Sequence, residues 1–307
     1  MSIPVVDFSA FRLSEKEVSD EQLHNLSKEM KTAFTDVGFV FLENTGITPE
    51  EVDRLMDISK RFFLQPDEQK QPFSRKSFAN NPNHGWVSLE TERLNPLQPG
   101  DLKEAFNTAS LRPDIKWPSA EFQEIQRSFF MRCKDLSLRV LRVMAHSLGL
   151  DPEVFLGAHR LIGTDGNATT LRSLYYPPVN REQAKEGQLR CGEHSDYGSI
   201  TLLFQGSEGL QVRSRSGEYI DAPCIAGAVL INIADLMQRW TSDYFVSARH
   251  RVLLPPAGDS STRQSLAFFV QPDDKALITC FDGSDKYPPV TAGDYIIERF
   301  NESYGRS

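Results

Sequence analysis

Two histidines and one aspartate have the residue types and spacing of metal ligands. His194 and Asp196 form an H-x-D pair in GEHSDYG, and extended backbone places side chains at i and i+2 on one face. His250 stands much later, in SARHRV, at the start of another expected strand. Two imidazoles and one carboxylate leave three coordination positions open, as at a non-haem ferrous centre. Taken alone, an H-x-D pair is more often an ordinary hydrogen bond.

A second pair of side chains offers an anion-binding site. Arg263 and Ser265 form an R-x-S pair at the entry to the apolar run LAFFV. An arginine fork binds a carboxylate through two parallel hydrogen bonds, and the serine hydroxyl adds a donor. An arginine aimed into a barrel core is costly unless it is paired, and a dicarboxylate ligand would pair it. Tyr176 in LYYPP offers a further hydroxyl. The alternative is a structural ion pair with one of the 42 acidic residues.

These candidates lie on short strands in the second half of the chain. After about Ala168, short apolar or alternating runs are separated by glycine-containing turns, which indicates an antiparallel sandwich or barrel. The expected strands are Thr170–Tyr176, Ile200–Phe204, Leu210–Arg213, Ala228–Ile233, Arg251–Leu254 and Ser265–Val270. A last helix is expected over Thr291–Tyr304.

The first half is predicted to be mostly helical. The spacing of apolar residues predicts helices from Asp20 to about Val37 and from Glu121 to Ser147, and Thr48-Pro49-Glu50-Glu51 predicts the start of another. Short strands are expected at Ile3–Phe8 and Val40–Leu42, and long loops with a little strand over residues 65 to 118. We expect one domain over residues 1–307, with a mostly helical region (1–160), a catalytic core (165–290) and a terminal helix (291–307). Three histidines in helical segments are expected to be structural: His24, His146 and His159.

Taken together, H-x-D, the distal histidine in RHRV and R-x-S resemble the iron- and 2-oxoglutarate-dependent oxygenases. The resemblance is to the branch that contains isopenicillin N synthase, the plant flavonoid oxygenases and fungal thymine 7-hydroxylase. It runs from IPVVDF through GFVFLEN, DLKEAFN and LRSLYYPP to RQSLAFF, and it is closest to thymine 7-hydroxylase between Gly187 and Val252. It implies an α+β fold whose core is a double-stranded β-helix (jelly-roll), buttressed by the N-terminal helical region with its one long helix.

The resemblance also implies a role for each candidate. The iron ligands of the family match His194, Asp196 and His250, and its clamp for the far carboxylate of 2-oxoglutarate matches three residues: Arg263, Ser265 and Tyr176. The expected enzyme is a non-haem dioxygenase that uses Fe(II), 2-oxoglutarate and O2, with ascorbate helpful in vitro. It would oxidise a small molecule and release succinate and CO2.

Two positions depart from the family pattern. Leu174 stands where many plant members have an asparagine that helps to hold the co-substrate, and Ala234 replaces the glycine of an N-x-G-D turn. The first departure motivates an alternative, an oxidase on the same scaffold that does not use 2-oxoglutarate. A non-catalytic ligand-binding barrel and a structural zinc site are further alternatives. A structural zinc site usually has four ligands including cysteine, and no cysteine occupies a ligand position here.

Substrate contacts are the least specific part of the pattern. The family positions nearest to substrate correspond to four residues: Phe106, Asn107, Arg190 and Phe269. If Arg190 faces the metal, it favours a polar or anionic substrate. Core packing for the phenylalanines and a surface charge for Arg190 are the alternatives.

The amino-acid composition limits the classes of partner and the cellular compartment that we expect for the protein. The 42 acidic and 34 basic residues give a net charge of -8, which argues against nucleic acid as the main partner. No apolar run approaches the length of a membrane helix, and MSIPVVDFSAF does not have the pattern of a secretory signal. The four cysteines are widely spaced, so we expect reduced thiols in the cytoplasm. The oligomeric state is not predicted.

Overall fold

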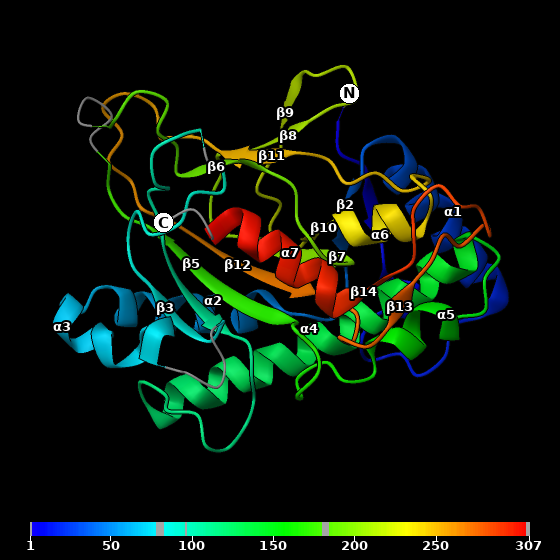
Figure 1. Ribbon diagram of the computed structural model, residues 1–307, viewed down its shortest axis with the longest axis horizontal. Helices are drawn as coiled ribbons and strands as arrows, with labels where there is room; N and C mark the ends of the chain where they lie inside the picture. The colour runs from blue at the N-terminus through cyan, green and yellow to red at the C-terminus, as the bar shows by residue number, and fades with distance from the viewer. Residues whose placement is uncertain (1, 78–82, 96, 180–183, 305–307) are drawn as a thin grey trace.

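The computed structural model describes residues 2–77, 83–95, 97–179 and 184–304 (Figure 1). Its largest sheet has the strand order β1-β2-β10-β7-β12-β5-β4-β3, and a four-stranded sheet has the order β6-β11-β8-β9. The strands of the large sheet are β1 (Val5–Asp7), β2 (Phe39–Glu43), β3 (Gly85–Val87), β4 (Glu104–Thr108), β5 (Thr170–Tyr176), β7 (Ile200–Gln205), β10 (Val229–Ile233) and β12 (Arg263–Val270). The small sheet is made of β6 (Cys191–His194), β8 (Leu210–Arg213), β9 (Tyr219–Asp221) and β11 (His250–Val252), and β13 (Leu277–Ile278) pairs with β14 (Val290–Thr291).

The helices begin where the sequence provides capping residues. Ser19 and Thr48 each form a capping box, with Gln22 and Glu51 respectively, so both helix starts are fixed by reciprocal side-chain bonds. The helices are α1 (Asp20–Asp36), α2 (Pro49–Phe63), α3 (Asp67–Lys70), α4 (Ala120–Ser147), α5 (Glu153–Leu156), α6 (Asp235–Trp240) and α7 (Ala292–Tyr304). Within the described ranges, none of them has the length and apolar character needed to cross a membrane.

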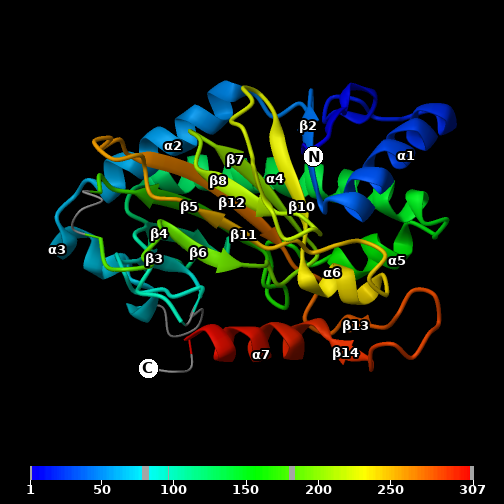
Figure 2. The same ribbon diagram turned by 90° about the horizontal axis from the view of Figure 1, so that it is seen from above.

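The two faces of the large sheet are covered differently. Helices α1, α2 and α4 pack on one face and bury the larger apolar core, whose members include Phe34, Phe62 and Phe130 (Figure 2). The four-stranded sheet covers the other face, with a smaller core that includes Phe41 and Val212. Two facing antiparallel sheets buttressed by the long helix α4 form the double-stranded β-helix, so the expected fold class is confirmed.

The N-terminal half contributes more strand than its sequence predicts. β1 to β4 supply half of the eight-stranded sheet. β1 and β2 match the strands expected at Ile3–Phe8 and Val40–Leu42, whereas β3 and β4 lie in the stretch expected to be long loops with a little strand. β3 and β4 have three and five residues, too few to show a clear alternation. The short helix α6 was also not predicted.

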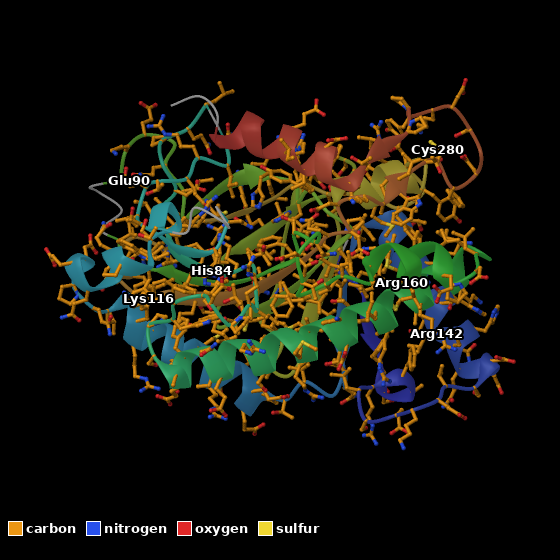
Figure 3. The ribbon with its side chains drawn as sticks, turned by 60° about the horizontal axis from the view of Figure 1, so that its bottom comes forward. His84, Glu90, Lys116, Arg142, Arg160 and Cys280 are labelled. Atoms are coloured by element: carbon orange, nitrogen blue, oxygen red, sulfur yellow. The ribbon has the colours of Figure 1, made fainter. Side chains whose placement is uncertain are left out.

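The remaining histidines have structural positions. His24 and His146 lie in α1 and α4 with their rings edge to face, as expected. His159 is buried in a 3-10 turn at residues 157–159, between the Phe155 carbonyl oxygen and the Ser199 hydroxyl. His84, labelled in Figure 3, is buried against aromatic rings.

Candidate active site

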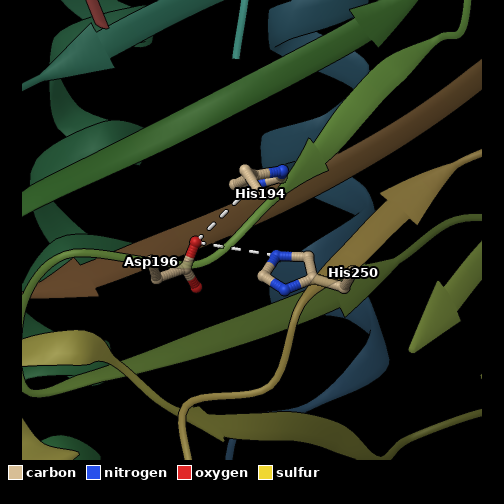
Figure 4. Close-up of side chains that lie close together, drawn as sticks. All are labelled: His194, Asp196 and His250. Atoms are coloured by element: carbon tan, nitrogen blue, oxygen red, sulfur yellow. Dashed lines mark ion pairs between the residues drawn. The ribbon is translucent and has the colours of Figure 1, made fainter. Parts of the chain in front are cut away.

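The three predicted metal ligands converge. His194 is the last residue of β6 and lies opposite His250, the first residue of β11, because the two strands pair antiparallel. Asp196 follows in the next turn. The Nε2 atoms of both histidines lie 3.6 Å from the same oxygen, Oδ1 of Asp196 (Figure 4). Among the described residues, these three form a group whose ligand atoms could hold one metal ion.

Hydrogen bonds around the group fix which atom of each side chain is available. Nδ1 of His194 lies 2.8 Å from the Gly192 carbonyl oxygen, and Nδ1 of His250 lies 3.2 Å from the Ala248 carbonyl oxygen. A carbonyl oxygen can only accept, so each Nδ1 carries a proton and each Nε2 is the nitrogen left to face a metal. Both imidazoles are therefore oriented as ligands through Nε2.

The carboxylate of Asp196 is oriented in the same way. Its Oδ2 atom accepts hydrogen bonds from the Thr201 hydroxyl at 2.6 Å and from the Asn232 amide at 2.8 Å. These bonds leave Oδ1, the atom that faces both histidines, for a cation. Two nitrogens and one carboxylate oxygen, each held by a partner behind it, fit an iron ion with open positions.

Burial and neighbouring groups keep His250 and Asp196 in the protonation states that a cation needs. Burial, and to a smaller extent the neighbouring His194, lowers the pKa of His250 to about 4. Burial raises the pKa of Asp196, but the two imidazoles and the hydrogen bonds from Thr201 and Asn232 outweigh it, and the net shift is downward. Near neutral pH the site therefore holds an ionised carboxylate beside a neutral His250.

The predicted anion clamp is a buried cation with uncharged partners. Arg263 is only 2% exposed and lies opposite Tyr176 across the β5–β12 pair. Within the described part of the chain, its hydrogen bonds go to neutral oxygens, including the Gln205 side chain at 3.1 Å and the Ser265 hydroxyl at 3.3 Å. A buried guanidinium without a carboxylate is unfavourable. One carboxylate of a dicarboxylate ligand such as 2-oxoglutarate fits this requirement.

Two neighbouring cavities share part of their walls at His194 and Asp196. The inner chamber leads to the clamp and is lined by the triad, Arg263, Ser265, Tyr176 and Leu174, among others. The outer chamber, about 630 Å³ with its open mouth, is lined by Asn83, Leu94, Asn107, Ala168, Thr170, Arg172, His194, Ser195, Asp196, Tyr197, Phe269 and Gln271. His194, Asp196, Arg172, Leu94 and Phe269 belong to both walls. A small molecule in the outer chamber would therefore lie beside the metal and the co-substrate.

The four candidate substrate residues divide into two pairs. Asn107 and Phe269 line the outer chamber, whereas Phe106 and Arg190 line neither chamber. Neighbouring residues of a strand face opposite sides, so Phe106 points from β4 into the helix-side core, against Phe62 and Phe122. Arg190 is buried and donates to the Ser261 carbonyl oxygen, beside the charge of Arg263. The structure thus places Phe106 in the helix-side core and Arg190 beside Arg263, outside both chambers.

Sequence reasoning named Leu174 and Phe269 but missed other chamber residues that the alternation of the strands could have found. Counting back from Tyr176 by twos along β5 passes Leu174 and gives Arg172 and Thr170, which line a chamber. Counting forward from Arg263 and Ser265 passes Phe269 and gives Ala267 and Gln271, which also line a chamber. The polar members of an otherwise apolar strand were the available signal.

Among these residues, Arg172 decides how much charge the wall of the outer chamber carries. Its guanidinium donates to Glu92 at 2.5 Å, and the carboxylate of Glu92 is 2% exposed. Lys103, also buried, lies 2.5 Å from Asp101 and 3.7 Å from Glu92. The loop that carries Glu92 and Asp101 thus pairs with both buried cations, so Arg172 faces the chamber as a hydrogen-bond donor that already has a carboxylate partner.

A closed zinc site does not fit this geometry. Cys191, the cysteine nearest to the triad, has its sulfur 4.0 Å from Nδ1 of His194, which is the nitrogen that donates to the Gly192 carbonyl. A metal on the Nε2 side therefore cannot share that sulfur. The described residues provide three ligands rather than four.

Comparisons with known proteins agree with the geometry. Residues 168–272 match the model of the 2OG-Fe(II) oxygenase superfamily, and residues 3–127 match that of the N-terminal region of non-haem dioxygenases in morphine synthesis. A full-length Neurospora crassa protein, solved in complex with alpha-KG and thymine, is 30% identical with a TM-score of 0.83, over 98% of this chain and 96% of that chain. The proline hydroxylase buaE of Petromyces alliaceus is 30% identical over 90% of this chain and 93% of its own. The UPF0676 protein C1494.01 of Schizosaccharomyces pombe is 34% identical over 100% of this chain and 94% of its own.

Proposed function

The chain belongs to the 2OG-Fe(II) oxygenase superfamily, and we propose that His194, Asp196 and His250 hold its iron. The protein is a non-haem dioxygenase that depends on Fe(II) and 2-oxoglutarate and oxidises a small-molecule substrate, with release of succinate and CO2. One observation carries the assignment of ligands: two Nε2 atoms lie 3.6 Å from Oδ1 of Asp196, while the other polar atoms of the three side chains are engaged behind them.

The clamp defines how the co-substrate enters. We propose that Arg263 and Ser265 bind the far carboxylate of 2-oxoglutarate, with the Tyr176 hydroxyl beside them. Burial raises the pKa of Tyr176, so its hydroxyl keeps a proton that it can donate. The chamber wall between clamp and triad is largely apolar, including Leu174, Leu203 and Ala267, and it excludes water from the chain of the co-substrate.

Each part of the site then has one task. Bound iron together with 2-oxoglutarate supplies the oxidation of a substrate C–H bond by O2. The Gly192 and Ala248 carbonyls hold the imidazoles in one tautomer, and Thr201 and Asn232 hold the carboxylate. The outer chamber orients the substrate against the open side of the triad, so that the bond to be oxidised lies close to the metal.

The comparisons give no support to the alternatives. The relatives include proteins named as 2-oxoglutarate-dependent, which disfavours an oxidase without that co-substrate. Leu174 lies opposite Ser265 in the β5–β12 pair and closes the inner chamber with an apolar side chain. Compared with the asparagine of many plant members, Leu174 loses one amide contact to the co-substrate but leaves the clamp residues in place. The complete triad disfavours a barrel that only binds ligand.

We propose that the substrate is a small, polar, uncharged molecule. The outer chamber presents the amides of Asn83, Asn107 and Gln271, and its one guanidinium among the described residues, Arg172, already has a carboxylate partner in Glu92. The ring of Phe269 provides an apolar surface beside them. Thymine, which is bound in the Neurospora crassa structure, is a molecule of this kind and is the first compound to test.

We also propose that the enzyme works in the cytoplasm. All four of its cysteines are free, which suits a reducing compartment.

The test is succinate release from 2-oxoglutarate by the purified protein with Fe(II) and ascorbate, first with thymine and then with a metabolite extract. The expected product is a compound heavier by one oxygen. His194→Ala should abolish both signals. Absence of any metal-dependent succinate across the panel would overturn the proposal.

A further inference from the structure

The C-terminal helix α7 reaches the active site through one side chain. Figure 2 shows α7 lying beside α6, and Arg299 of α7 forms an ion pair with Asp235, the first residue of α6, at 3.0 Å. The same guanidinium lies 4.8 Å from the centre of the Tyr197 ring. Both contacts lead toward the turn that carries Asp196.

The two partners of Arg299 are tied to the residues on either side of Asp196. The carboxylate of Asp235 also accepts from the Ser195 hydroxyl at 2.9 Å, and its backbone N–H donates to the Asp196 carbonyl oxygen at 2.8 Å. Ser195 and Tyr197 both line the outer chamber. The guanidinium therefore holds two chamber residues from behind without entering the chamber itself.

We propose that Arg299 is a positioning residue for substrate binding, which acts by fixing Tyr197 and the Asp235–Ser195 pair as one wall of the outer chamber. This inference rests on the proposed function of that chamber. Its physical basis is the attraction between a guanidinium and an aromatic face, which restricts the tilt of the tyrosine ring, combined with an ion pair that restricts the guanidinium. Without it, the ring can rotate and the chamber loses its shape.

A role confined to docking the helix makes different predictions. Arg299 is 30% exposed and Asp235 19% exposed, and such partly exposed pairs contribute little to global stability. If Arg299 only docked the helix, its removal would loosen α7 and leave the turn at residues 195–197 unchanged. A positioning role requires the turn to change while the metal and co-substrate sites remain.

The experiment compares Arg299→Gln and Arg299→Lys in the full-length, Fe(II)-loaded enzyme. The matched control is Arg239→Gln on α6, because Arg239 is also half-buried and lies 5.0 Å from the Tyr287 ring, but lines neither chamber. The activity probe is thymine or, if thymine is not oxidised, the metabolite that gains one oxygen in the profiling experiment. Titration of 2-oxoglutarate at the metal, followed by absorbance without oxygen, reports the inner chamber.

For Arg299→Gln we expect the substrate KM to rise by about tenfold, with 2-oxoglutarate affinity within about twofold of the wild type. Arg299→Lys should be intermediate, because it keeps the ion pair and loses the planar contact. The control should leave KM unchanged. An unchanged KM in Arg299→Gln, or an equal rise in the control, overturns the inference.

A second readout needs no substrate. Hydrogen–deuterium exchange of the segment 195–197 should become faster in Arg299→Gln and stay unchanged in Arg239→Gln. Faster exchange confined to α7 would overturn the positioning role. If the wild-type enzyme yields no oxygenated product, the proposed function fails, while the exchange result still decides what Arg299 does.

Discussion

Arg263 and Tyr176 face each other across the β5–β12 pair, with the guanidinium 5.0 Å from the centre of the tyrosine ring. The register of one antiparallel pair thus brings a buried cation and a buried hydroxyl to the same end of the inner chamber. This arrangement needs no further residue to fix its spacing, because opposite positions in a ladder are held by the backbone. It is the basis of the first prediction.

Arg263→Leu should weaken 2-oxoglutarate binding by about 100-fold, since a charge-assisted pair to a carboxylate is lost. Fe(II) binding should persist, because the triad does not contact this side chain. The measurement is anaerobic titration of the Fe(II) protein with 2-oxoglutarate. Arg213→Leu, at an exposed arginine on β8, is the control and should bind normally. Normal binding by Arg263→Leu would refute the clamp.

The clamp and the triad were predictable because each depends on a local rule. The i, i+2 spacing of His194 with Asp196, and of Arg263 with Ser265, puts both members on one face before any tertiary information is used. The same rule extended along the strand gives Arg172 and explains why an arginine interrupts an apolar run.

The residues that come from loops and helices follow no such rule. Asn83 lines the outer chamber and Glu92 supports Arg172 from behind it, both from segments without periodicity. Glu92 bonds Arg172 and Asn83 bonds Thr170 across 80 and 87 residues of sequence. Arg190 precedes the first residue of β6, so no alternation defined its direction. Ala234, in place of glycine, has φ −109 and ψ 170, which is ordinary extended backbone, so the turn before α6 accepts alanine.

The bonds behind Asp196 lead to a second prediction. Thr201→Val removes the hydroxyl that donates to Oδ2 at 2.6 Å and keeps the shape of the side chain. Fe(II) affinity should fall by roughly 10- to 100-fold, because the carboxylate is free to turn. Competition with a fluorescent chelator measures it. Thr241→Val is the control: Thr241 is equally buried and bonded, but to α6 backbone. Equal iron affinity in the two variants would contradict the role of Thr201.

The buried His159 predicts a loss of stability in acid. Burial lowers its pKa to about 4 from 6.5, so below pH 6.5 the unfolded chain takes up a proton that the folded protein refuses. The free energy of unfolding should be unaffected above pH 6.5 and should fall by up to about 3 kcal/mol from this group as the pH drops to 4. Burial lowers the pKa values of His84 and, in the metal-free protein, of His250 to about 4 as well, so part of the loss has these other sources.

Urea unfolding of the metal-free protein at pH 7 and pH 5 tests the contribution of His159. His159→Phe should be less stable at pH 7, because the Phe155 carbonyl and Ser199 lose their partner, but its stability should change less between the two pH values. His24→Gln, at an exposed position of α1, should keep the full dependence. A dependence as steep in His159→Phe as in the wild type would exclude His159 as its source.

Two buried glutamines should respond oppositely to the same substitution. Gln126 has both ends of its amide bonded, to Thr108 at 3.1 Å and Ser173 at 3.2 Å, whereas Oε1 of Gln271 is buried with no hydrogen-bond partner among the described residues. Gln126→Met leaves two buried hydroxyls with fewer partners and should lower the free energy of unfolding by about 1 to 3 kcal/mol. Gln271→Met removes an unsatisfied oxygen from the chamber wall and should leave stability unchanged or higher.

Gln271→Met should weaken substrate binding even though it does not lower the stability of the protein. A polar atom that is unsatisfied in the substrate-free chamber is a cost that only a ligand can offset, so substrate KM should rise in this variant while thermal stability does not fall. Thermal unfolding and steady-state kinetics on the same preparations measure both quantities. If Gln271→Met were as destabilising as Gln126→Met, the amide would be part of the packing of the barrel and not of its substrate chamber.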